Sequence, residues 1–166
     1  MIERRLAFGV ALLILLADQF TKWLVTVPLQ LQSVRQIVLL PFFNLTWTEN
    51  RGISLGLLHA TSPAMRWALV AVTAAIAIAV AIWIIREKRV GDQIALGLVL
   101  GGAIGNIMDR SRFGYVVDFA DLHFGGFRPF LVFNVGDAAI SIGVVILLLR
   151  AFLLRSEGPE EKIEHA

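Results

Sequence analysis

The chain has 166 residues, 57% of them hydrophobic, and a mean hydropathy of +0.75. Because a soluble domain is only about 45–50% apolar, and because the excess here lies in four blocks, the composition predicts a membrane protein with several spans. A net charge of only +2 gives no sign of a basic surface that would bind nucleic acid. The absence of cysteine excludes disulfides, thiol catalysis and thiolate metal sites. The three histidines lack metal-ligand spacing.

The first apolar block covers residues 6–25, which is long enough to cross a hydrocarbon core of about 30 Å. A basic start before an apolar run also occurs in cleaved signal peptides, but this run is long and no small-residue cleavage site follows it closely. The sequence therefore predicts an uncleaved transmembrane helix. Asp18 and Lys22 are four residues apart and share one face of it. They form either an ion pair near the interface or a brace for a polar site in that leaflet.

Residues 27–59 do not span the membrane and predict a small β-structured element outside the lipid, here called the β-cradle. Residues 44–48 alternate apolar and polar side chains and include β-branched and aromatic types, which is typical of a strand. Residues 34–40 are a candidate partner strand. Residues 49–52 favour a turn, and on local chemistry alone Asn50 is either a turn residue or part of a site.

Three further apolar blocks predict spans at residues 64–85, 94–113 and 131–154. We expect residues 1–154 to form one integral-membrane domain and 155–166 a polar cytoplasmic tail. The fold class is therefore membrane all-α, with four transmembrane helices and a small extracytoplasmic β-cradle. In the third span Gly97, Gly101 and Gly105 repeat every four residues, which favours close approach of another helix.

Basic residues predict the orientation. Residues 86–89 form a tight basic loop and both ends of the chain are basic, whereas the other basic residues are more dispersed. The positive-inside rule therefore favours both termini in the cytoplasm. The β-cradle and the segment between the third and fourth spans then face the outside of the membrane.

Polar residues gather around the junction of the third and fourth spans: Asn106, Asp109, Arg110, Asp118, Asp121, Asn134 and Asp137. An acid inside a membrane is a functional hypothesis by default, because its insertion costs about 2.5–3.5 kcal/mol at a helix centre. Asp118 and Asp137 come from different segments at similar depth, and two carboxylates in one site share a proton. Such a pair can hydrolyse a peptide bond. A proton path or a structural polar cluster would also use these residues, and Asp121 is predicted to be a plain loop charge.

Five motifs then carry a resemblance: Asp-Gln-Phe-Thr-Lys at 18–22, Asn-Arg-Gly at 50–52, Gly-Gly-Ala-Ile-Gly-Asn-Ile-Met-Asp-Arg at 101–110, Val-Val-Asp-Phe at 116–119 and Phe-Asn-Val-Gly-Asp at 133–137. In order and spacing they resemble the signal peptidase II family, the lipoprotein signal peptidases of bacterial membranes. The resemblance implies an intramembrane aspartic endopeptidase without metal or cofactor. It implies cleavage of prolipoproteins before a diacylglyceryl-modified cysteine, and inhibition by globomycin.

The resemblance also implies residue roles. Asp118 and Asp137 match the catalytic aspartates. The residues that match positions lining or bracing the site are Asn50, Gly52, Asn106, Asp109, Arg110, Asn134, Asp18 and Lys22. The implied partners are diacylglyceryl prolipoproteins and membrane phospholipids, the implied state is a monomer, and the implied location is the bacterial cytoplasmic (inner) membrane. Gly136 stands where the family usually has alanine, and Ile53 and Leu55 also depart from its pattern.

Two other functions remain open at this point. A proton-coupled small membrane transporter would explain the intramembrane acids, but most of those acids fall in the outer half of the predicted bundle. A non-catalytic membrane scaffold would tolerate the loss of both Asp118 and Asp137.

Overall fold

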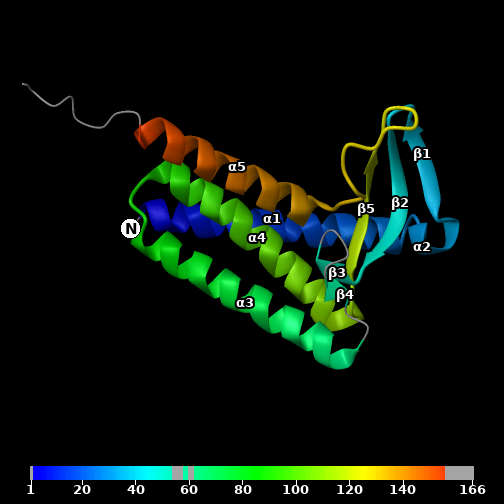
Figure 1. Ribbon diagram of the computed structural model, residues 1–166, viewed down its shortest axis with the longest axis horizontal. Coiled ribbons are helices and arrows are strands. Elements are labelled where there is room, and N and C mark those ends of the chain that lie inside the picture. Colours follow the sequence, from blue (N-terminus) through cyan, green and yellow to red (C-terminus); the bar gives the residue numbers. More distant parts are fainter. Residues whose placement is uncertain (1, 54–57, 60–61, 156–166) are drawn as a thin grey trace, which may run out of the picture.

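The computed structural model describes residues 2–53, 58–59 and 62–155. Four long helices form a bundle, and a small sheet stands at one end of it (Figure 1). The helices are α1 (Ile2–Thr26), α3 (Pro63–Arg86), α4 (Val90–Phe113) and α5 (Val135–Arg155). Each is long and apolar enough to cross a membrane. The predicted four-span membrane fold is confirmed.

The fourth helix begins later than the predicted span. Phe133 and Ala120 exchange backbone hydrogen bonds, with the Phe133 N–H donating at 3.0 Å and the Ala120 N–H at 2.8 Å. Phe133 is thereby held extended against a strand and cannot enter the helix. The helix therefore begins at Val135 instead of residue 131, and Asp137 lies in its first turn, earlier than the sequence suggested. Of the predicted tail at 155–166, Arg155 is the last residue of α5, and residues 156–166 lie outside the described residues.

The sheet joins the β-cradle to the segment after α4. Strands β1 (Gln36–Leu40) and β2 (Phe43–Asn50) confirm the two predicted strands, and β5 (Val116–Leu122) is a third. The strand order is β1-β2-β5 and both pairings are antiparallel. A short helix, α2 (Leu31–Val34), precedes β1, and β3 (Gly52–Ile53) pairs with β4 (Leu58–His59).

Strand β5 was not predicted, because its residues are buried on both faces and their sequence shows no alternation. One apolar cluster attaches this sheet to the bundle. Its buried members are Val25, Leu31, Leu45, Trp47, Val117, Phe119 and Ala120. Because side chains from α1, β2 and β5 share this cluster, the position of β5 is fixed relative to the helices.

The glycines of α4 confirm the predicted close packing. A Cβ atom on Gly97 would collide with the carbonyl oxygen of Ala7, and one on Gly101 with that of Ala11, both in α1. A Cβ on Gly105 would collide with the Asp18 carboxylate. Glycine is therefore needed along the contact between α1 and α4, where the helix backbones approach each other closely.

We expect Gly101→Ala to destabilise the protein by about 1–3 kcal/mol, because the added methyl group pushes α1 away from α4. Thermal unfolding of the purified protein in detergent measures this loss. Gly9→Ala is the matched control, since a Cβ at Gly9 meets no atom within 4 Å and its melting temperature should not fall. Equal melting temperatures for the two variants would contradict the packing role.

Candidate active site

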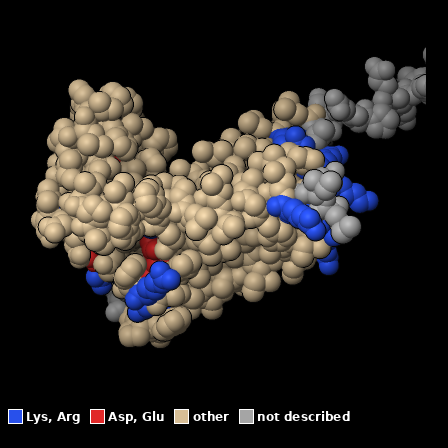
Figure 2. Space-filling view, turned by 180° about the vertical axis from the view of Figure 1, so that it is seen from behind, with Lys and Arg blue, Asp and Glu red and all other residues tan. Residues whose placement is uncertain are grey.

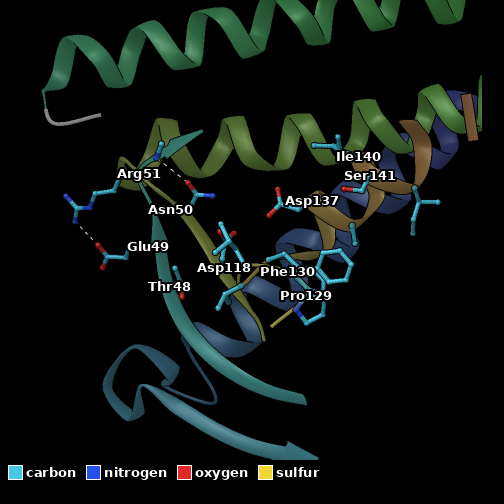
Figure 3. A pocket seen from close by; sticks show the side chains of 16 residues that line it. Thr48, Glu49, Asn50, Arg51, Asp118, Pro129, Phe130, Asp137, Ile140 and Ser141 are labelled. Atoms are coloured by element: carbon cyan, nitrogen blue, oxygen red, sulfur yellow. Dashed lines mark hydrogen bonds and ion pairs between the residues drawn. The ribbon is translucent and has the colours of Figure 1, made fainter. Parts of the chain in front are cut away.

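Asp118 and Asp137 face the same cleft, although they come from different elements. Asp118 lies on β5 and is only 1% exposed, and Asp137 lies in the first turn of α5. Both line a cleft of about 880 Å³. Figure 3 shows the two carboxylates together in this cleft, between β2 and α5. The structure therefore brings together the two acids that the sequence singled out.

Asn134 links the two carboxylates. Its Nδ2 donates to Asp118 Oδ1 at 2.6 Å, and its Oδ1 accepts the Asp137 N–H at 2.8 Å. The Asn134 N–H in turn donates to Asp137 Oδ2 at 3.3 Å. This reciprocal pattern is a capping box at the start of α5. The capping of α5 by Asn134 thus fixes the position of the Asp137 side chain. Because Asn134 also binds Asp118, it fixes the position of Asp137 relative to Asp118.

Burial raises the pKa of Asp118 to about 7, and the negative charge of Asp137 acts in the same direction. Hydrogen bonding to the side chains of Asn134 and Asn50 and the positive charge of Lys22 oppose this rise. Asp118 is therefore partly protonated near neutral pH. A carboxylate pair that shares one proton requires such a group.

A buried charged network lies beneath the pair. The Lys22 ammonium lies 2.7 Å from Asp18 Oδ2 and 2.9 Å from Asp109 Oδ2, and its side chain is 5% exposed. Asp18 Oδ1 accepts the N–H of Gly136, and Asp109 Oδ2 accepts the N–H of Val117. These two backbone groups immediately precede Asp137 and Asp118. The ion pair predicted on the first helix is therefore connected to the site and does not extend into solvent.

Asn50, Gly52, Asn106 and Arg110 complete the predicted set. Asn106 Nδ2 donates to Asp137 Oδ1 at 2.8 Å, and Arg110 Nη2 donates to the carbonyl of Gly52 at 2.9 Å. The N–H of Gly52 donates to Asn50 Oδ1 at 3.2 Å. Arg110 thus ties the end of α4 to Gly52, which lines the cleft.

Two residues near the site were misread or missed. The prediction that Asp121 is a plain loop charge is wrong: it is 1% exposed on β5, accepts a hydrogen bond from the Thr46 hydroxyl and pairs with Arg128. This error follows from the unpredicted strand. Arg66 of α3 was not singled out, yet it donates to the carbonyls of Arg110 and Ser111 at the end of α4. No local pattern marks such a contact between helices.

The cleft has walls of different character. Strand β2 and the residues after it supply a polar wall, with Thr48, Glu49, Asn50 and Arg51. The opposite wall is mainly apolar and contains Pro129, Phe130 and Ile140 (Figure 3). Leu131 and Ile142 also line the cleft. Within residues 2–53, 58–59 and 62–155, no three His, Asp or Glu side chains are grouped so that they could hold a metal ion.

Together the fold and the site define a multi-pass membrane protein with an aspartate pair in one cleft, which is the architecture of an aspartic hydrolase working at a membrane. The chain matches the signal peptidase (SPase) II family over residues 10–153. It belongs to this family, whose members are aspartic peptidases. The membership confirms the resemblance that the five motifs indicated.

Known relatives cover nearly the whole chain. The lipoprotein signal peptidase of Sphingopyxis alaskensis is 60% identical over 151 residues, which is 90% of this chain and 87% of that protein. The lipoprotein signal peptidase of Rhizorhabdus wittichii is 55% identical over 164 residues, which is 98% and 95%. A bacterial membrane enzyme solved by the in meso method at 2.3 Å superposes with a TM-score of 0.79 at 28% identity, covering 96% of this chain and 94% of that one.

Family membership removes the scaffold alternative, and the placement of the acids removes the transporter alternative. In the described part of the chain, the buried acids of the network lie at the sheet end of the bundle, whereas Asp92 at the other end of α4 is paired with Arg150. A proton relay needs groups along the whole membrane depth. The acids here are gathered around one cleft, as a peptidase requires.

Proposed function

We propose that this signal peptidase II removes signal peptides from prolipoproteins with Asp118 and Asp137 as its catalytic pair. Family membership supports the activity. The observation that carries the residue assignment is the hydrogen-bonded bridge of Asn134, which holds both carboxylates at one cleft. Asp118 and Asp137 are then the groups that contact the reacting atoms.

The mechanism uses one proton shared by the pair. The ionised carboxylate takes a proton from a water molecule, and the water oxygen forms a bond to the scissile carbonyl carbon. The protonated carboxyl donates a hydrogen bond to the carbonyl oxygen and polarises it. When the carbon–nitrogen bond breaks, that proton passes to the leaving amine. Asn106 and Asn134 each donate a hydrogen bond to one member of the pair and keep both oriented.

The two walls of the cleft fit a diacylglyceryl prolipoprotein cut just before its modified cysteine. The apolar wall formed by the loop before α5 and by α5 itself suits acyl chains and an apolar signal peptide. The polar wall on β2 suits the unwound backbone at the scissile bond, because peptide groups cannot be left without partners in lipid. The substrate enters from the bilayer, where surrounding phospholipids contact the helices. The site is complete within one chain, which is consistent with a monomer.

Charge supports the orientation in the bacterial cytoplasmic membrane. Figure 2 shows Lys and Arg side chains gathered at the end of the bundle far from the sheet, and a long uncharged belt between the two ends on the visible face. Exposed members of this group include Arg4, Arg5, Arg86, Lys88 and Arg89. By the positive-inside rule, this end and both chain termini lie in the cytoplasm. The cleft then lies near the outer face of the membrane.

A gel-shift assay with a synthetic prolipoprotein tests the function. The purified protein in lipid vesicles should cut the diacylglyceryl-modified substrate just before the modified cysteine, and globomycin should block the cut. The same peptide without the diacylglyceryl group is the control and should be cut poorly. Equal cleavage of both substrates would contradict the role given to the apolar wall, and no cleavage of either would overturn the function.

A further inference from the structure

All three protons of the Lys22 ammonium have an oxygen within reach. Two face the carboxylates of Asp18 and Asp109, at 2.7 and 2.9 Å, and the third faces Asn106 Oδ1 at 3.3 Å. An ammonium group has three donors and no acceptor. Only the oxygen of the Asn106 amide can therefore be directed at Lys22, and this fixes which way the amide is turned.

The direction set at Asn106 continues through the site. Its Oδ1 also accepts Asn134 Nδ2 at 3.2 Å, so its own Nδ2 faces Asp137 Oδ1. Asn134 Nδ2 donates to Asp118 Oδ1 as well, while its Oδ1 accepts the N–H of Asp137. Each of the two amides thus donates one hydrogen bond to a carboxylate of the pair, and the Asn106 oxygen accepts from both Lys22 and Asn134.

We propose that Lys22 is a positioning residue that orients the Asn106 and Asn134 amides, so that Asp118 and Asp137 each receive an N–H donor. This inference rests on the proposed function of the two aspartates. Without Lys22 the Asn106 amide can turn over and present its oxygen to Asp137. A carboxyl group facing an amide oxygen must keep a proton to make a hydrogen bond, so the pair would ionise less readily.

Other charges around Lys22 also act on the pair and must be separated from this effect. They are Asp18 on α1, Asp109 and Arg110 on α4, Asp118 on β5 and Asp137 on α5. Removing Lys22 removes one positive charge from this set. The double variant Asp18→Asn with Lys22→Met removes one charge of each sign, so the total charge stays constant while the directing donor is lost. An asparagine at this position can still accept the N–H of Gly136.

The test is the pH dependence of kcat/KM for cleavage of the diacylglyceryl prolipoprotein in lipid vesicles. For both Lys22→Met and the double variant, we expect the acid side of the profile to move to higher pH by about one unit or more. Lys22→Arg keeps a positively charged donor that has no acceptor. The pH at the midpoint of the acid side of its kcat/KM profile should therefore stay at the wild-type value. Where Lys22→Met does not fold, the charge-neutral double variant is measured.

The outcomes distinguish this inference from the proposed function. Loss of activity in Lys22→Met and the double variant with an unshifted midpoint would show a purely structural ion pair and overturn the inference. A shift in Lys22→Met alone would assign the effect to charge and also overturn it. An inactive wild-type protein, or full activity after Asp118→Asn, would instead overturn the proposed function. Melting temperatures measured alongside show whether each variant is folded.

Discussion

Asp118→Asn and Asp137→Asn are each expected to lower kcat/KM for the diacylglyceryl prolipoprotein by about 10³-fold or more. Each change removes a group that must either accept a proton from water or give one to the leaving amine. An amide at either position still makes hydrogen bonds of similar geometry, so the protein should insert and fold. The gel-shift assay on purified variants in lipid vesicles measures the loss.

Asp121→Asn is the matched control for this experiment. Asp121 lies on the same strand as Asp118 and is equally buried, but it does not line the cleft. Asp121→Asn removes the negative charge that pairs with Arg128 but keeps an oxygen that can accept from the Thr46 hydroxyl, and it should leave the pH profile of cleavage as in the wild type. Full activity in purified Asp118→Asn or Asp137→Asn would end the proposal that these two aspartates are catalytic.

Asp118→Asn, which should remove activity, is also expected to make the protein more stable above neutral pH. The pKa of Asp118 is raised to about 7 in the folded protein and is about 3.9 in the unfolded chain. The folded state therefore binds more protons, so the wild-type free energy of unfolding falls as pH rises from about 4 to about 7. Asp118→Asn removes this loss.

At pH 4 the two proteins should differ little, and at pH 8 the variant should be more stable by about 4 kcal/mol. Thermal unfolding at several pH values measures the difference. Asp92→Asn is the control, because Asp92 is also buried but is paired with Arg150, and its removal should lower stability at pH 8. A pH-independent gain at position 118 would show that ionisation of Asp118 is not what destabilises the site.

A variant that loses activity but gains stability is the result expected when the replaced carboxylate serves function and not folding. The cleft keeps an acid where burial and a like charge disfavour its ionised form. The energetic cost is met by contacts elsewhere, such as the apolar cluster beneath the sheet and the close approach of α1 and α4. Packing around the site therefore holds Asp118 in a position where its ionised form is disfavoured.

Much of this protein could be predicted from its sequence. The four helices follow from apolar blocks that are long enough to span lipid, and the packing role of Gly97 and Gly101 follows from their spacing. The first two strands follow from alternation in β2 and its neighbour. The family follows from five motifs in order. All of these signals are contained in contiguous residues.

Only the tertiary structure decided how the motifs meet. Strand β5 is buried on both faces and carries no periodic signal, so the sequence placed Asp121 in a loop and left the setting of Asp118 open. The hydrogen bond from Gly136 to Asp18 joins residues 118 positions apart. Such contacts depend on which helix faces pack together, and local propensity does not encode that. Hydropathy determined where the chain crosses the membrane, and helix packing determined that its distant polar residues share one cleft.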